Sequence, residues 1–240
     1  MKKIIFIVFI LGNSLNTFAQ TSGKVIYNVT IEDIYKDKTD TKKQIVDFFD
    51  EVRKQASNIK LNLIFNKKYS KFQAIKSLPI EGYEMPYGMA KKIISDGVYY
   101  QNKDSIKSFR HKTVSGENFF INEDKEIINW EIQKHFKKKI GAFNCMKAIG
   151  SFNITNSNSK KENKFNIIAW FTTEIPASYG PLGYGFLPGL ILELKQGPIT
   201  YSFKSFEKLD DVYIKYPKVK KTITSDEFNQ RYISAFKNKF

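Results

Sequence analysis

The chain has 240 residues, of which 15% are aromatic, and this supply of large apolar side chains excludes a disordered chain. Lys and Arg number 39 against 24 Asp and Glu, so the formal net charge is +15. A positive field of this kind attracts acidic lipid surfaces, anionic glycans or nucleic acid. Nearly all of the excess is Lys, with Arg only at positions 53, 110 and 231, whereas proteins that recognise bases rely on Arg. We therefore expect no nucleic-acid partner.

The first twenty residues have the layout of a secretory signal peptide. Lys2 and Lys3 precede eight apolar residues at 4–11, and small residues around Ala19 suit a signal peptidase. Eight apolar residues are too few to cross a bilayer, which needs about 20. We expect residues 1–19 to be cleaved, and residues 20–240 to form one periplasmic or secreted domain. No cysteine near the cut offers a lipid attachment site, and no later segment is apolar enough to span a membrane.

In the first half of the mature chain, apolar residues with a period of two predict strands with one buried face. These strands lie at 25–31, 61–65, 69–75, 98–100, 106–111, 118–121 and 127–132. A helical period at 41–57 predicts a helix, with Asp40 or Thr41 available as its N-cap. Four Pro and Gly residues predict a loop at 77–90, and Asp96-Gly97 predicts a tight turn after a short strand at 93–94.

The second half continues the same pattern. Further strands are predicted at 144–154, 165–172, 190–195 and 199–203, and Thr224 with Glu227 forms a capping box that opens a helix at 225–238. Short, evenly spaced strands favour an antiparallel meander over parallel βαβ units. We therefore expect an α+β fold, in which one curved, mostly antiparallel sheet of eight to ten strands resembles a half-barrel. The two helices are expected on its concave side.

The most distinctive stretch is residues 169–194, which reads as a strand, a Gly/Pro loop, a tight turn and another strand. We call the part between the two strands, residues 173–189, the Gly/Pro segment. It has glycines at 180, 183, 185 and 189 and prolines that include Pro181 and Pro188. Leu187 to Leu190 suits a type II turn, in which Gly189 would supply a positive φ. Gly183-Tyr184-Gly185 is not expected to bind phosphate, because a strand rather than a helix follows.

The same stretch resembles the family named for its GLPGLI motif, found in exported proteins of Gram-negative bacteria. The motif stands here as F-L-P-G-L-I at 186–191, so that only Phe186 departs from it. Residues 140–148, with Phe143 in a Tyr position, resemble the family's I-x-x-Y-x-C-x-K-A strand. Other matching positions are Trp130, 169–172, 174–176 and Gly180-Pro181. The resemblance spans about 125–195 and implies export, but the family is uncharacterised and supplies no catalytic residues.

Candidate chemistry is sparse. Cys145 with His135 or His111 as a base is a possible nucleophile, but it lies between apolar residues in a strand, where a cysteine is normally structural. Two histidines and one cysteine at these spacings do not form a metal set. We expect no catalytic residue, no metal site and no cofactor.

The leading hypothesis is a non-enzymatic binding or interaction module for an apolar ligand or for an envelope protein. Its expected surface surrounds the Gly/Pro segment and consists of Trp170, Phe171, Glu174, Tyr179, Tyr184 and Phe186. The aromatic members of this set either pack in the core, which is their usual role, or line a mouth for an apolar or sugar ligand. Pro181, Pro188 and Gly189 are expected to shape the turn. Two alternatives are a Cys- or carboxylate-dependent hydrolase of envelope material and a purely structural envelope component.

Overall fold

A computed structural model describes residues 22–35, 42–123, 128–155 and 162–237. The predicted signal peptide and the predicted N-cap residues Asp40 and Thr41 lie outside these ranges. Among the described residues, no helix is both long enough and apolar enough to cross a membrane.

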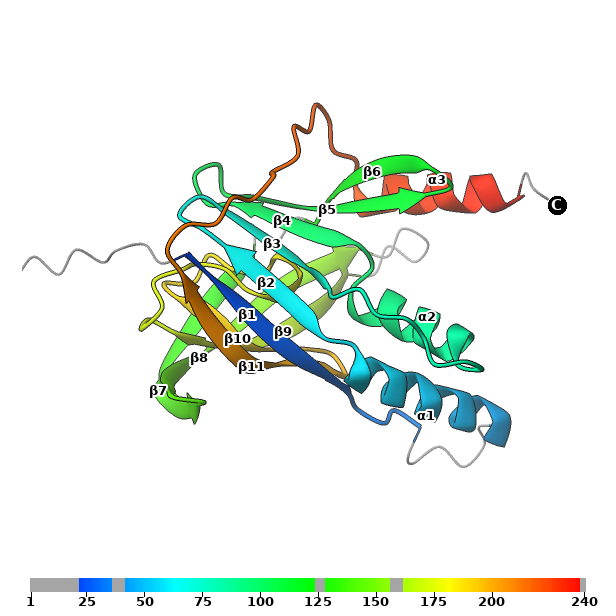
Figure 1. The fold of residues 1–240 in the computed structure, drawn as a ribbon, viewed down its shortest axis with the longest axis horizontal. Coiled ribbons are helices and arrows are strands. Elements are labelled where there is room, and N and C mark those ends of the chain that lie inside the picture. The colour runs from blue at the N-terminus through cyan, green and yellow to red at the C-terminus, as the bar shows by residue number, and fades with distance from the viewer. Residues whose placement is uncertain (1–21, 36–41, 124–127, 156–161, 238–240) are drawn as a thin grey trace, which may run out of the picture.

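In the described ranges, eleven strands form one antiparallel sheet, more than the eight to ten expected from the sequence (Figure 1). Their bounds are β1 Ser22–Ile31, β2 Leu61–Phe65, β3 Tyr69–Ala74, β4 Val98–Asn102, β5 Lys107–Val114, β6 Glu117–Asn122, β7 Asn129–Ile140, β8 Phe143–Thr155, β9 Glu162–Thr172, β10 Leu190–Gln196 and β11 Ile199–Leu209. The order β6-β5-β4-β3-β2-β1-β11-β10-β9-β8-β7 consists of two meanders, β1–β6 and β7–β11. A single long-range pairing, between β1 and β11, joins them.

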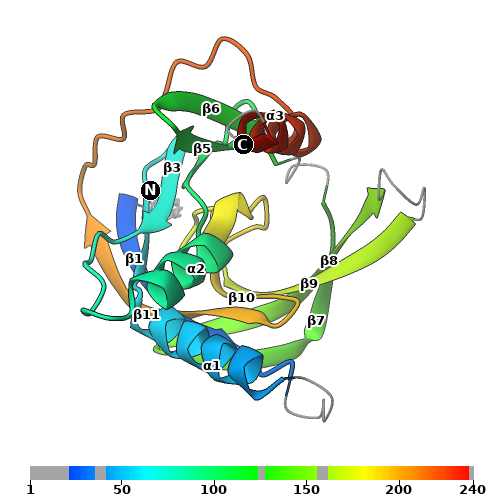
Figure 2. The same ribbon diagram turned by 90° about the vertical axis from the view of Figure 1, so that its right-hand side faces the viewer.

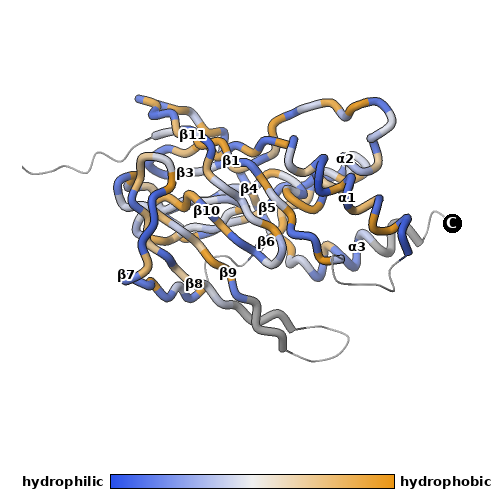
Figure 3. Tube along the Cα trace, turned by 90° about the horizontal axis from the view of Figure 1, so that it is seen from below, coloured by the Kyte–Doolittle hydropathy of each residue, from blue (hydrophilic) through white to orange (hydrophobic). Residues whose placement is uncertain are grey.

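The sheet curls into a half-barrel, as expected from the sequence (Figure 2). Figure 3 shows polar and apolar residues alternating along the strands, which is the pattern that predicted them. In β1, for example, Val25, Tyr27 and Val29 are at most 1% exposed and face the core. The concave side is not empty, because the Gly/Pro segment lies in it. The turn Pro181–Gly183 follows β9 yet contacts β3, β4 and β5 of the other meander.

Three helices accompany the sheet in these ranges: α1 Lys43–Asn58, α2 Glu84–Ile94 and α3 Ser225–Lys237. They gather at one end of the half-barrel rather than within its concave side, which the Gly/Pro segment already occupies (Figures 1 and 2). The predicted capping box is confirmed, since Thr224 N donates to Glu227 Oε2 at 2.9 Å and Glu227 N donates to Thr224 Oγ1 at 3.1 Å. The residue that precedes α1 is Lys42, which makes no side-chain cap.

The prediction of a loop at 77–90 and a strand at 93–94 was wrong for α2. Pro86 lies in the first turn of this helix, where backbone N–H groups have no acceptor within the helix, so a residue without an N–H is tolerated. Ala90 and Ile94 are four residues apart, are fully buried and anchor the helix. Asp96-Gly97 does form a turn, with φ +129° at Gly97, but it joins α2 to β4.

Candidate functional site

The Gly/Pro segment folds back on itself as a small hairpin inside the half-barrel. Tyr184 N donates to Pro181 O at 2.9 Å, and Leu182 and Gly183 have φ values of +54° and +76°. Consecutive positive φ values with this hydrogen bond are the geometry of a type I′ turn. Tyr179 pairs with Gly185 on the two arms. The tip of the segment is therefore held in one conformation against the opposite meander.

The predicted type II turn with positive φ at Gly189 was wrong. The φ of Gly189 lies outside the left-handed region, and residues 187–189 form a bend. A Cβ at Gly189 would lie 2.0 Å from the carbonyl oxygen of Thr172, so glycine is needed there for space. Positive φ occurs three residues earlier instead, at Phe186 with +63°. This is the position at which the chain departs from the GLPGLI motif, where the motif has glycine.

The six residues of the expected surface do not lie together. Phe171, Tyr179 and Tyr184 are at most 2% exposed and belong to the core. Trp170 points to the opposite face of β9 from Phe171, because successive side chains of a strand alternate.

The other two are tied to neighbouring segments. Glu174 is exposed, and its Oε1 accepts hydrogen bonds from Asn144 N at 2.8 Å and Asn144 Nδ2 at 3.0 Å. Phe186 is half-buried, and its N–H donates to Ser178 O at 3.0 Å. A ligand or partner role for Trp170, Glu174 and Phe186 stays a prediction.

Cys145 has the properties of a structural residue. Its side chain is buried, and its Sγ lies 3.8 Å from Phe143 O. Burial raises the pKa of the thiol to about 11, so that it is protonated at neutral pH and is a poor nucleophile. His111, one proposed base, has its Nε2 3.0 Å from Asn118 Oδ1 and stacks on Phe120. The cysteine-hydrolase alternative therefore gains no support from this geometry.

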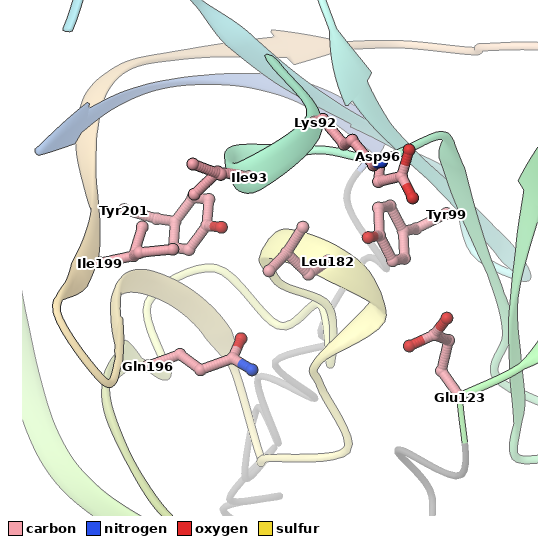
Figure 4. A pocket seen from close by; sticks show the side chains of 9 residues that line it. All are labelled: Lys92, Ile93, Asp96, Tyr99, Glu123, Leu182, Gln196, Ile199 and Tyr201. Carbon is pink, nitrogen blue, oxygen red and sulfur yellow. The ribbon is translucent and has the colours of Figure 1, made fainter. Parts of the chain in front are cut away.

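A pocket of about 200 Å³ opens where the C-terminal end of α2 meets the Gly/Pro segment, and we call it the mouth pocket (Figure 4). Its walls come from α2, β4, the chain after β6, the turn at 181–183 and the β10–β11 hairpin. The lining residues are Lys92, Ile93, Asp96, Tyr99, Glu123, Leu182, Gln196, Ile199 and Tyr201. Segments that are far apart in the sequence thus meet at one small cavity.

Arg110 of β5 organises the acidic side of the mouth pocket. Its Nε donates to Glu123 Oε1 at 2.6 Å and its Nη1 donates to Asp96 Oδ2 at 2.9 Å. Burial alone would lower the pKa of Arg110, but the charge of Glu123, with Tyr99 and Asp96, more than offsets this and raises it. The planar guanidinium therefore stays charged and holds both carboxylates in place.

Apart from the Lys92 ammonium, the remaining polar groups of the mouth pocket are uncharged. Burial raises the pKa of Tyr99, with a further contribution from Glu123, and burial raises that of Tyr201, so both phenols are neutral. The Tyr201 hydroxyl donates to Ile94 O at 2.9 Å. The Gln196 carboxamide has no hydrogen-bond partner among the described residues and points into the pocket (Figure 4). The pocket thus offers hydrogen-bonding groups opposite an apolar wall.

Sequence analysis did not identify the residues of the mouth pocket, although one signal was present. Arginine is rare in this Lys-rich chain, and two of the three arginines each hold two carboxylates. Arg53 pairs with Asp33 at 3.1 Å and with Asp50 at 2.5 Å, as Arg110 pairs with its own two partners. The rare Arg residues therefore occur at two places where one planar cation joins two carboxylates.

Comparison with known proteins gives a family of unknown function and a distant likeness in fold. Residues 130–193, from β7 to β10, match the family described as "Protein of unknown function (Porph_ging)". The expected similarity to an uncharacterised family is thus confirmed, and the GLPGLI name itself stays a prediction. No curated protein matches the chain.

Two solved structures of PNGF-II are similar to this chain. The structure in space group P21 has 13% identity and a TM-score of 0.50, covering 88% of this chain and 32% of that one. The structure in space group C2 has 15% identity and a TM-score of 0.48, covering 80% of this chain and 28% of that one. The chain spans about a third of their length, and at this identity the likeness concerns the fold alone.

Proposed function

We propose that the protein is a non-catalytic binding module that holds one sugar residue in the mouth pocket, outside the cytoplasm as residues 1–19 predict. One observation carries the proposal: Tyr99, Glu123 and Gln196 come from three separate segments and converge on one cavity (Figure 4). A sugar ring has hydroxyls that both donate and accept hydrogen bonds, and C–H faces that suit the apolar wall of Ile93 and Leu182. Small-molecule sites generally combine a few placed polar groups with such a wall.

The size and polarity of the mouth pocket favour a sugar over the apolar ligand expected from the sequence. The concave interior, where an apolar ligand would lie, is filled by Tyr179, Tyr184 and Leu187. The pocket of about 200 Å³ is smaller than the roughly 300–1,000 Å³ of sites for drug-sized ligands, so it suits a single ring. Leu182 holds a positive φ at its wall, and strained backbone of this kind is concentrated at functional sites.

The expected affinity is modest. A hexose has about 12 non-hydrogen atoms, and at about 0.3 kcal/mol per atom it would gain roughly 4 kcal/mol on binding. This corresponds to a Kd on the order of 1 mM. Such an affinity is typical of a module that gains its strength from several sugar residues or several copies.

The test is an NMR titration of the ¹⁵N-labelled protein with glucose, galactose, mannose and N-acetylglucosamine. We expect at least one sugar to shift the amide signals of residues 92–99, 182–184 and 196–201. Gln196→Ala should weaken binding about three- to tenfold, the effect of one lost hydrogen bond. Gln73→Ala, the same change on β3 outside the pocket lining, should have no effect. Two results would contradict the proposal. One is that no sugar binds at a sugar concentration of about 20 mM, some twenty times the expected Kd. The other is that the Gln196→Ala protein binds as tightly as the unmodified protein.

A second candidate function is docking on an envelope protein, which the apolar surface around α2 favours. Leu78 is 91% exposed, Met85 is 74% exposed and Ile80 is 61% exposed. Met85, Met89 and Ile93 are spaced four residues apart and form an exposed apolar stripe on α2. A photo-crosslinking residue at position 80 should then capture a partner in the native envelope. The same residue at Ile106, which is 57% exposed on the β4–β5 turn, should not, and equal capture at both positions would exclude this candidate.

A further inference from the structure

A basic groove lies beside the mouth pocket, on the other side of the last turn of α2. It has a volume of about 490 Å³ and is bounded by α2, β5 and α3. Lys91, Lys92, His111, Lys112 and Tyr232 are among the residues that line it. Lys92 and Asp96 line both cavities, so the groove and the mouth pocket adjoin each other at these two side chains.

The charges of the basic groove do not cancel. Lys112 Nζ lies 2.5 Å from Asp96 Oδ2, so this carboxylate is already paired within the cluster around Arg110. Lys91 and Lys92 make no ion pair in the described part of the chain. Two ammonium groups on consecutive residues, neither of them in an ion pair, produce a local positive potential that attracts an anion.

An aromatic ring holds two of these ammonium groups in place. Lys92 Nζ lies 5.6 Å from the ring centroid of Tyr232, and Lys112 Nζ lies 5.7 Å from the same centroid. Contact with the ring face favours both cations at this spacing and places them on one side of the groove. The groove is thus built by the packing of α3 near α2 and β5, and does not depend on exposed lysines alone.

The C-terminal end of α2, which faces the groove, does not fully offset the positive potential of Lys91 and Lys92. C-terminal carbonyls of a helix bear partial negative charge, which would repel an anion. Here Lys91 O accepts a hydrogen bond from Ser95 N at 2.9 Å, and Ile94 O accepts one from the Tyr201 hydroxyl at 2.9 Å. With these carbonyls paired, the lysine ammonium groups are the stronger influence on a ligand in the groove.

We infer that the ligand is an acidic sugar, with its ring in the mouth pocket and its carboxylate or phosphate in the basic groove against Lys91 and Lys92. This inference rests on the proposed function and adds the charge class of the ligand. The position of Lys92 at both cavities would place the anionic group within reach of a ring held in the mouth pocket. Carboxylate and phosphate share the chemistry that the lysines recognise, so the experiment includes both.

The experiment compares each neutral hexose with its uronic acid and its 6-phosphate, for glucose, galactose and mannose, by calorimetric or NMR titration at about 50 mM and about 500 mM salt. For the hexose that binds, we expect an acidic form to bind about tenfold more tightly at the lower salt concentration and to lose most of this gain at the higher one. Lys91→Gln should remove much of the gain and leave binding of the neutral hexose unchanged, because Lys91 lines only the groove. The control is Lys139→Gln, which removes the same charge from an exposed lysine on β7.

The outcomes separate this inference from the proposed function. If neutral and acidic forms bind equally, or if Lys91→Gln and Lys139→Gln behave alike, the inference is wrong and the sugar module stands. If the acidic forms bind but Gln196→Ala has no effect on them, the ring does not occupy the mouth pocket, and both statements fail. Inorganic phosphate is the last probe. If it binds the protein as tightly as the sugar phosphate does, the sugar ring contributes nothing to binding and the inference is wrong.

Discussion

Replacing Gly189 by Ala would place a methyl group where β9 and the start of β10 approach most closely. The new Cβ would lie 2.0 Å from Thr172 O and 2.6 Å from Thr172 C, both backbone atoms that cannot rotate away. Ordinary contacts of a Cβ are at 3.4 Å or more, so the two segments would have to separate by more than 1 Å. Leu190 pairs with Thr172 in the β9–β10 ladder and donates its N–H to Ile175 O at 3.2 Å, so the separation strains both contacts.

The net effect is the difference between two terms of opposite sign. Overpacking of a close contact costs about 1–3 kcal/mol, and more where backbone must move. Alanine also restricts the unfolded chain, which stabilises the protein by about 0.4–1 kcal/mol. Because both clashing atoms are backbone, we take the upper end of this cost, about 3 kcal/mol, and after subtraction expect Gly189→Ala to reduce the free energy of unfolding by about 2–2.5 kcal/mol. For a chain of this length that corresponds to a fall in Tm of about 4–10 °C.

Urea denaturation and thermal melting followed by circular dichroism measure this change. Gly88→Ala is a matched control, because Gly88 lies inside α2 and no heavy atom lies within 4 Å of the place that its new Cβ would take. That substitution should stabilise the protein by about 0.5–1 kcal/mol, the usual preference for Ala over Gly in a helix. If Gly189→Ala is neutral or stabilising while Gly88→Ala behaves as expected, the close approach to Thr172 does not exist in the native protein.

Three further predictions concern single residues. Phe186→Gly should be about 1 kcal/mol more stable than Phe186→Ala in urea, the reverse of the usual order, because both remove the ring and only glycine is relaxed at φ +63°. At neutral pH, Cys145 in the native protein should react with a thiol reagent far more slowly than it does in urea. Its reaction rate in the native protein should rise as the pH approaches the thiol pKa of about 11. Rapid labelling of the native protein at neutral pH would refute its burial. Arg110→Met should lower the free energy of unfolding by about 2–4 kcal/mol, because it leaves Asp96 and Glu123 without their shared cation. An effect below about 1 kcal/mol would show that this cluster is not formed.

Helices, strands and caps that depend on residues close together in the sequence were predictable. The period of two at 25–31 matches β1, and the helical period at 41–57 matches α1 to within two residues. The capping box at Thr224 lies where the side-chain chemistry placed it. In α2, by contrast, the Pro and Gly content favoured a loop, and the helix exists because Ala90 and Ile94 are buried when it packs against α1.

The position of the Gly/Pro segment could not be read from its composition. Aromatic residues beside a glycine-rich stretch suit either core packing or a binding surface, and the structure places Phe171, Tyr179 and Tyr184 in the core of the half-barrel. The mouth pocket also depends on tertiary structure, because Asp96 and Glu123 belong to one meander and Gln196 to the other, and they meet only in the folded half-barrel.

By itself the sequence determined the strands, two of the three helices in the described ranges and the curved antiparallel sheet, since alternation, capping and turn chemistry act over a few residues. Only the tertiary structure decided that this segment is buried, that Gly189 serves close approach rather than positive φ, and which side chains share a cavity. The physical reason is that residues of the two meanders are far apart in the sequence and come into contact only in the folded sheet, where β1 pairs with the distant strand β11.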